Sequence, residues 1–128
     1  MPPCTLEYSA NLEATADIAA LCRDVAAAIL ATGIFERGAI RVRALRCDAY
    51  AIADQLPGNA FLDMRFRIGA GRSLDDKRRA GDVIFEAAAR RLASQLSQPH
   101  FALSLEVLEI DAALSWKRNA IHPRLHDK

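Results

Sequence analysis

The sequence has little of several features that mark specialised classes of protein. Its formal net charge is only +1 over 128 residues, so no overall field favours nucleic acid or an anionic membrane surface. No apolar run approaches the ~20 residues that a membrane-spanning helix needs. The first twenty residues also lack the basic region and continuous apolar run of a signal peptide. The composition therefore predicts a cytoplasmic protein with neither a nucleic acid nor a membrane as partner.

Cysteine and histidine are also scarce. The cysteines are odd in number and share no metal-ligand spacing, which favours small buried thiols in a reducing compartment over disulfides or a metal site. They are Cys4, Cys22 and Cys47. The histidines show no ligand pattern either, and we assign no role to His100, His122 or His126. We expect no metal site.

Lysine is rare as well, because only Lys77, Lys117 and Lys128 are lysines and the other basic residues are all arginine. A G+C-rich genome would explain this bias without any functional reason. Arginine is nevertheless the better bidentate partner for carboxylates.

Four segments alternate apolar and polar residues with the period of a strand, over residues 4–9, 39–50, 60–69 and 101–110. Between the first two, an apolar stripe predicts a helix that ends near Gly33. Between the last two, Ser73 is a candidate N-cap for a second helix whose stripe runs from Ile84 to Leu96 and which Pro99 ends. The order is strand-helix-strand, a turn at residues 56–59, and strand-helix-strand again.

This order predicts one domain, residues 1–128, with two βαβ halves over residues 2–57 and 58–111 and a less regular tail over 112–128. One sheet would carry both helices on a single face. The other face would mix apolar and cationic side chains, so we expect copies of the chain to cover it in a homo-oligomer. It would carry Arg41, Arg43, Leu45, Phe61, Arg65 and Arg67. In the tail, we expect the Trp116 side chain to pack against another surface, such as that of a second subunit.

Several stretches resemble known families. The stretch IGAGRSLDDKRRAG resembles the strand-to-helix turn of 4-oxalocrotonate tautomerase, and residues 31–43, 59–73, 103–111 and 116–122 resemble 5-carboxymethyl-2-hydroxymuconate isomerase. The resemblance runs nearly end to end. It implies an α+β tautomerase-like fold with a four-stranded mixed sheet, a homotrimer, and a cofactor-free isomerase. The implied reaction is a 1,3 proton shift in homoprotocatechuate (3,4-dihydroxyphenylacetate) meta-cleavage, on a polycarboxylate.

The resemblance implies that Pro2 is the general base once Met1 has been removed. The physics fits, because an α-amine has a pKa of about 7.7–8.0, which burial and nearby cations would lower towards the working pH. Pro3 counts against assigning this role to Pro2 directly. The aminopeptidase that removes Met1 acts poorly before such a Pro-Pro step, so we expect processing to be impaired.

The resemblance also implies that Arg72 binds a substrate carboxylate and polarises the reacting end, and that Arg41 binds a second carboxylate. Arg72 follows two glycines at the predicted start of the second helix, where anions are favoured. Weaker candidates are Arg43, Arg65 and Arg67, which could instead form interface salt bridges or a solvated edge. The aromatic residues Phe35 and Phe61 could wall the pocket or simply pack in the core or at an interface.

Two alternatives stay open. One is a tautomerase of another unsaturated acid, such as phenylpyruvate, on the same scaffold. The other is a trimeric anion-binding module without catalysis, which follows if Met1 stays in place and keeps the Pro2 nitrogen an amide. Fold alone does not separate these, because one fold hosts many functions.

Overall fold

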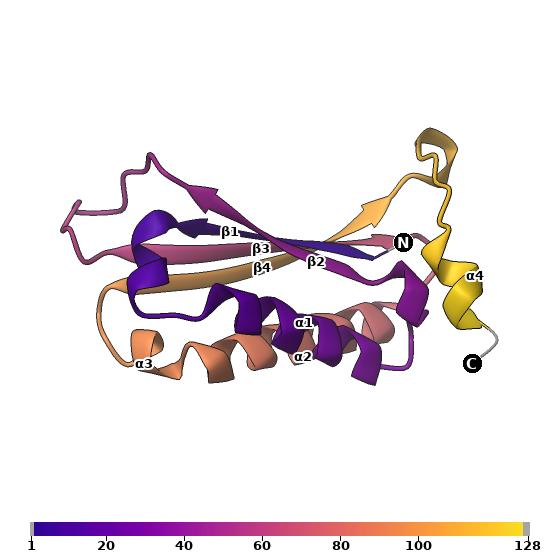
Figure 1. The fold of residues 1–128 in the computed structure, drawn as a ribbon, viewed down its shortest axis with the longest axis horizontal. Helices are drawn as coiled ribbons and strands as arrows, with labels where there is room; N and C mark the ends of the chain where they lie inside the picture. Colours follow the sequence, from indigo (N-terminus) through magenta and orange to yellow (C-terminus); the bar gives the residue numbers. More distant parts are fainter. Residues whose placement is uncertain (1, 127–128) are drawn as a thin grey trace.

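The fold is a four-stranded sheet in the order β2-β1-β3-β4, seen in a computed structural model that describes residues 2–126 (Figure 1). The strands are β1 Pro3–Ser9, β2 Arg41–Cys47, β3 Ala60–Gly69 and β4 Phe101–Ile110. Each outer strand runs parallel to its central neighbour, and the two central strands run antiparallel. The predicted mixed sheet built from two βαβ units is confirmed.

In each half, one long helix connects the two strands. Helix α1 spans Ile18–Ala31, and its N-cap Asp17 accepts a hydrogen bond from the Ala20 amide at 3.0 Å. Helix α2 spans Leu74–Arg91, and the predicted N-cap Ser73 accepts one from the Asp76 amide at 3.1 Å. The shorter helical segments are η1 Ala10–Ala14, η2 Arg37–Ala39, α3 Ala93–Leu96, η3 Ala112–Leu114 and α4 Ile121–His126.

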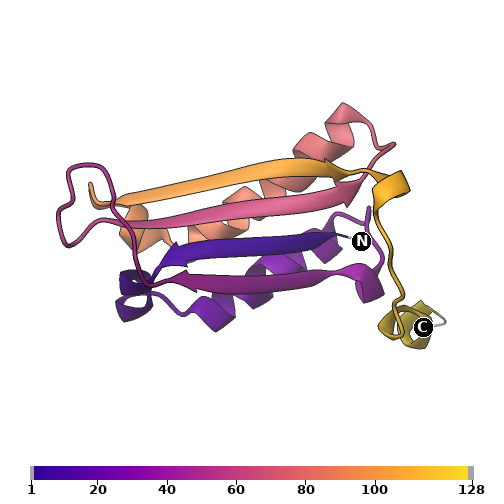
Figure 2. The same cartoon turned by 90° about the horizontal axis from the view of Figure 1, so that it is seen from above.

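The molecule has two layers, because α1 and α2 lie side by side on one face of the sheet (Figure 1). The alternation along β3 points Leu62, Met64, Phe66 and Ile68 into the layer between, where all are fully buried. The opposite face has no helix over it within the described chain (Figure 2). Arg43 and Arg65, which the sequence predicts on this face, lie on either side of Thr5, because each pairs with it from a neighbouring strand.

Two expectations about the second half are wrong. The second helix does not run on to Leu96, because it breaks at Leu92 (φ −106°, ψ 26°) before the single turn α3. As a result Leu96 is 42% exposed and does not continue the core stripe, whereas Ile84, Ala88 and Leu92 are buried.

The tail leaves the sheet after β4 and carries α4 beyond the end of the sheet at which the N-terminus lies (Figures 1 and 2). Trp116 is 86% exposed there, so the expected packing is absent within the described chain. None of the helices formed by residues 2–126 combines the length and apolarity that crossing a bilayer would require.

Candidate active site

The strand directions bring four parts of the chain to one end of the sheet. Strands β1 and β2 begin there, since Pro3 pairs with Arg41. Strands β3 and β4 end there, since Gly69 pairs with Ile110. The N-terminus, the start of β2, the turn before α2 and the tail therefore share this end, which we call the proline end.

A cavity of about 430 Å³ lies at the proline end. Pro2 is buried, and it lines this cavity together with the predicted carboxylate-binding residue Arg72. The other lining residues come from the segment before β2 and from the tail: Ile34, Phe35, Glu36, Ala39, Lys117, Asn119, His122 and Pro123. Met1 lies outside the described residues.

Arg72 is held in place by two contacts. One guanidinium nitrogen donates a hydrogen bond to the Gly69 carbonyl at 3.1 Å. The guanidinium carbon lies 4.6 Å from the centre of the Phe35 ring, in cation-π geometry. Phe35 in turn packs edge-to-face against buried Phe66, with ring centres 5.3 Å apart. The core therefore fixes the aromatic surface on which the guanidinium lies.

The turn that delivers Arg72 depends on Gly71. Its φ of +105° is a backbone conformation that residues with a Cβ rarely adopt. This conformation lets the chain reverse direction between the end of β3 and the Ser73 N-cap within three residues.

Arg41 lies at the proline end but is not among the residues that line the cavity. It is exposed at the start of β2, beside Pro3 on the edge of the sheet. Arg43 and Arg65 lie farther along the open face, whereas Arg67, which follows the Phe66 that pairs with Cys4, lies at about the same level as Arg41. All three are exposed. Arg65 approaches Asp63 at 4.0 Å, a weak exposed ion pair.

The two aromatic candidates separate. Phe35 lines the cavity, as one of its two interpretations predicted. Phe61 does not line it, because it belongs to the start of β3 at the opposite end of the sheet. There its ring lies edge-to-face with Tyr50, with centres 6.2 Å apart.

Sequence reasoning missed the contribution of the tail. It assigned no role to His122 and did not consider Lys117 or Asn119, yet all three line the cavity beside Pro2. Two signals were present. The stretch WKRNAIH was one of those that resembled the isomerase family, and Asn119 is an effective N-cap residue just before an apolar position.

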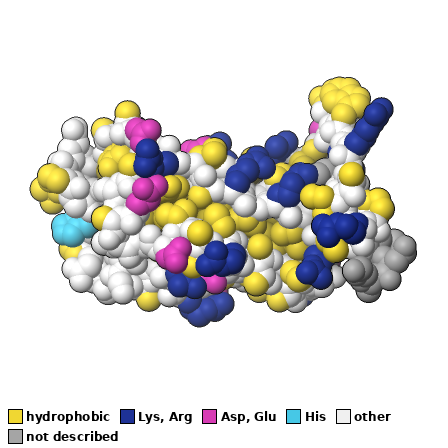
Figure 3. Space-filling model, viewed as in Figure 1, with side chains coloured by type: hydrophobic (Ala, Val, Ile, Leu, Met, Phe, Trp, Pro, Cys, Tyr) yellow, Lys and Arg dark blue, Asp and Glu magenta, His cyan; other side chains and the backbone are white. Residues whose placement is uncertain are grey.

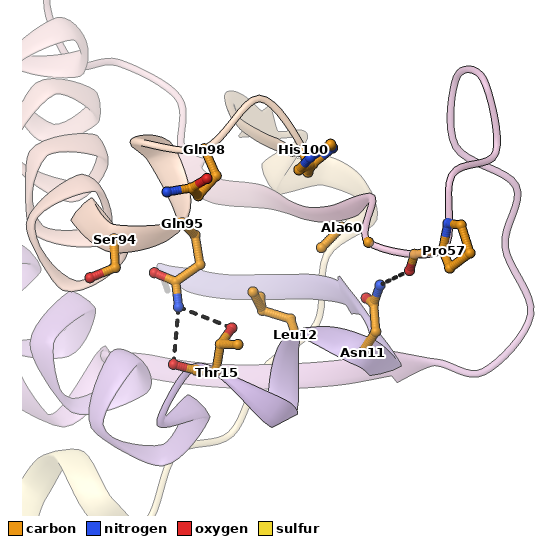
Figure 4. A pocket seen from close by; sticks show the side chains of 10 residues that line it. Asn11, Leu12, Thr15, Pro57, Ala60, Ser94, Gln95, Gln98 and His100 are labelled. Atoms are coloured by element: carbon orange, nitrogen blue, oxygen red, sulfur yellow. Dashed lines mark hydrogen bonds between the residues drawn. The ribbon is translucent and has the colours of Figure 1, made fainter.

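A second cavity, of about 510 Å³, lies at the opposite end of the sheet, beneath the loop between β2 and β3 (Figure 4). His100 is its one titratable lining residue. Gln95 donates hydrogen bonds across it to the carbonyl and hydroxyl of Thr15, at 3.0 and 3.1 Å. Lacking any Lys or Arg in its lining, this cavity is poorly suited to an anion.

The thiol nearest to Pro2 in the sequence is not poised for chemistry. Cys4 is fully buried, and burial raises its pKa to about 12, with Cys22 adding to the rise. Cys22 and Cys47 are half-buried and unbridged. Within residues 2–126, no three or more His, Cys, Asp or Glu side chains are grouped as metal ligands.

The electrostatics of the proline cavity favour anions. Its lining carries two permanent cations, Arg72 and Lys117, against the single carboxylate of Glu36. Lysine and arginine side chains (dark blue) also gather towards the α4 end of the face shown in Figure 3. This charge balance suits the binding of an anion, and the Pro2 nitrogen could exchange a proton with that anion only as an amine, after removal of Met1.

The chain is similar to known proteins over nearly its whole length. The 5-carboxymethyl-2-hydroxymuconate isomerase family model matches residues 2–125. A 5-carboxymethyl-2-hydroxymuconate Delta-isomerase of Escherichia coli is 35% identical over 122 residues, which cover 95% of this chain and 97% of that protein.

Solved structures give the same result. An isomerase of this name from Deinococcus radiodurans R1 superposes with a TM-score of 0.89 at 40% identity, covering 96% of this chain and 92% of that one. A fused 4-OT trimer, 15% identical with a TM-score of 0.71, covers 91% of this chain and 93% of that one, and shares the fold. The chain belongs to the 5-carboxymethyl-2-hydroxymuconate isomerase family.

Proposed function

We propose that the protein is a cofactor-free isomerase that shifts a proton within 5-carboxymethyl-2-hydroxymuconate, in homoprotocatechuate degradation. The observation that carries the proposal is that buried Pro2 and oriented Arg72 line one cavity in a chain of this family.

Pro2 is the base in this mechanism. Once Met1 is gone, the ring nitrogen is a secondary amine, and burial beside the cations Arg72 and Lys117 favours its neutral form. The nitrogen takes the proton of the 2-hydroxyl group, so the proton moves from that oxygen to C5, a 1,5 shift rather than the 1,3 shift that the resemblance implies. The oxygen lone pair becomes the new C=O bond, the double bonds shift along the chain, and the electron pair reaches C5. The prolinium then returns the proton to C5, so atoms and charge balance.

Arg72 stabilises the charge that develops during this shift. Its fork binds the carboxylate beside the 2-hydroxyl group and draws electron density towards that end of the dienolate. The Gly69 carbonyl and the Phe35 ring hold the guanidinium before substrate arrives, so little reorganisation is needed. Arg41 is proposed as a second carboxylate-binding residue, at the edge of the same end of the sheet.

We also propose that the chain is a homotrimer. The support is the sheet face that no helix covers, on which Leu45, 48% exposed, lies among arginines. Subunits that pack through this face would bury it. Sedimentation equilibrium decides between the trimer and a monomer.

The Pro2-Pro3 sequence favours a second candidate, the non-catalytic anion-binding module. If Met1 is retained, the Pro2 nitrogen is an amide without useful basicity, and the cations of the cavity would bind an anion without turnover.

The test begins with the intact mass of protein from its native host, which reports whether Met1 is present. Turnover of 5-carboxymethyl-2-hydroxymuconate is then followed by ultraviolet absorbance, with Pro2→Ala as the comparison. Pro2→Ala replaces the rigid ring nitrogen by a primary α-amine, so we expect kcat to fall by about tenfold or more, below the 10²–10⁴-fold range for complete loss of a general base. Equal rates for the two proteins, both lacking Met1, would refute the assignment of Pro2.

A further inference from the structure

One wall of the proline cavity comes from the segment that follows β4, and it supplies a cation that the mechanism above does not use for substrate binding. Lys117 and Asn119 line the same cavity as Pro2 and Arg72. They are separated from Arg72 by more than forty residues of sequence, so the fold alone brings them together.

Hydrogen bonds of the Asn119 side chain connect this segment to the rest of the protein. Its side-chain nitrogen donates a hydrogen bond to the Gly38 carbonyl at 2.8 Å. Its side-chain oxygen accepts hydrogen bonds from the amides of Ile121 and His122, at 2.9 and 3.1 Å, and so begins α4. One carboxamide therefore links η2, which precedes β2, to the tail.

Gly38 makes this contact possible by its lack of a side chain. It is buried, and a Cβ there would lie only 2.6 Å from the His122 Cα, a backbone atom that cannot rotate away. Any larger residue at this position would push α4 off η2. The tail between β4 and α4 would move with it, and Lys117 lies in that tail.

Lys117 is placed for an anionic ligand. Among residues 2–126, it has no hydrogen bond or ion pair with another side chain, and it is exposed along the cavity lining. Glu36, the one carboxylate in the lining, is therefore not its partner. Arg72, by contrast, is already oriented by Gly69 and Phe35.

We propose that Lys117 binds a substrate carboxylate other than the one at Arg72, and that Gly38 and Asn119 are positioning residues for it. This rests on the proposed function for the identity of the substrate, a molecule with three carboxylates. A compact ammonium on a flexible stem suits a carboxylate on a rotatable arm, whereas the planar fork of Arg72 suits the rigid reacting end.

Binding can be tested separately from catalysis with propane-1,2,3-tricarboxylate, a saturated tricarboxylate that cannot isomerise. Isothermal titration calorimetry on the whole chain would compare Lys117→Met, Lys117→Arg and Arg118→Met. Arg118 is the matched control, because it is exposed, adjacent and cationic but does not line the cavity. We expect Lys117→Met to weaken binding about tenfold, the size of one charge-assisted hydrogen bond. Arg118→Met should stay within about twofold of wild type, and Lys117→Arg, which keeps the charge but not the compact ammonium, should bind with an affinity between those of Lys117→Met and wild type.

The positioning claim needs its own pair of variants. Gly38→Ala should weaken binding as much as Lys117→Met does, with the circular dichroism spectrum of the sheet unchanged. Gly58→Ala is the control, because a Cβ there meets nothing within 4 Å and its φ is not positive. If Gly38→Ala does not fold, Asn119→Ala removes the same link.

These outcomes decide the inference whatever the fate of the isomerase assignment. If Lys117→Met and Arg118→Met lose the same affinity for the tricarboxylate, the effect is one of overall charge and the inference is overturned. Failure of the wild-type protein to bind the tricarboxylate would also overturn it. Binding that depends on Lys117 without any turnover would leave the inference standing and refute the isomerase. In active enzyme, Lys117→Met should raise KM about tenfold, because an interaction with the bound substrate is lost. It should also move the pH profile of kcat to higher pH, because Lys117 favours the neutral form of Pro2.

Discussion

The strongest test of the site concerns the orientation of Arg72 as well as its charge. Arg72→Ala removes the guanidinium. Arg72→Lys keeps a positive charge but loses the hydrogen bond to the Gly69 carbonyl and the broad contact with Phe35. If orientation matters, the lysine variant should fall well below wild type despite its unchanged charge.

The contacts set the expected magnitudes. Losing a preorganised donor to a developing negative charge costs about 10²–10³ in kcat, which is the expectation for Arg72→Ala. In Arg72→Lys, the hydrogen bond is worth about 0.5–1.5 kcal/mol and the cation-π contact about 0.5–1 kcal/mol. Together these amount to about 1–2.5 kcal/mol and predict a loss of about 5- to 60-fold in kcat/KM, because each ~1.4 kcal/mol is a factor of ten.

The assay is initial-rate ultraviolet kinetics on 5-carboxymethyl-2-hydroxymuconate, with protein whose mass shows that Met1 is absent. Arg118→Met serves again as the control for loss of a nearby charge. Thermal unfolding should change little, since Arg72 is only half-buried. An Arg72→Lys enzyme equal to wild type, or an Arg72→Ala enzyme within about threefold of it, would refute the reasoning, because either is far below the loss of an oriented donor.

Three further predictions follow from single features. Gly71→Ala must force a Cβ into φ +105°, so it should lower the free energy of unfolding by at least ~1 kcal/mol in urea titrations. Cys4 is fully buried with a pKa of about 12, so iodoacetamide at pH 8 should alkylate it only after denaturation, as mass spectrometry would show. The Tyr8 hydroxyl, followed by Arg46, lowers the Glu13 pKa, so this carboxylate stabilises the fold above its unfolded-state pKa. That contribution should be lost as pH falls below the usual value of 4.5, and less so in Glu13→Gln, by unfolding titrations at each pH.

The strands could be predicted from the sequence because one face of each is buried. Both β3 and β4 have the predicted bounds. Buried apolar residues alternate along β3 from Leu62 to Ile68, and half-buried ones alternate along β4 from Phe101 to Val107, after which Leu108 interrupts the pattern. The Ser73 N-cap was predictable for a local reason too, because its hydroxyl bonds the backbone only three residues away.

The break at Leu92 could not be predicted from periodicity. No Gly or Pro lies between Leu92 and Pro99, so the local sequence gives no reason for the helix to stop. The contact that accompanies the break is distant, because the Gln95 carboxamide on α3 bonds Thr15, eighty residues earlier. A periodic pattern within eighteen residues carries no information about a contact between residues eighty positions apart.

Some residues of the candidate site could be predicted from the sequence and others could not. Pro2 and Arg72 were found through resemblance to a family and lie together because of strand direction. Lys117 and His122 were missed because their segment has no helical or strand period, and their place beside Pro2 depends on the Asn119-Gly38 hydrogen bond. Burial at Gly38 is a property of the folded tail, and the glycine alone does not reveal it.

The duplicated fold itself sharpens the argument for function. Each end of the sheet receives both strand starts of one βαβ half and both strand ends of the other, so the two ends are built alike and both hold a cavity of similar size, about 430 and 510 Å³. They differ in chemistry. One lining holds Pro2, Arg72 and Lys117, while the other has amides, hydroxyls and His100. Space is therefore not what distinguishes the candidate active site, and a fold comparison alone would rank the two ends equally. The distinction comes from where the chain begins β1, the glycine turn before α2, and the tail that only the second half possesses.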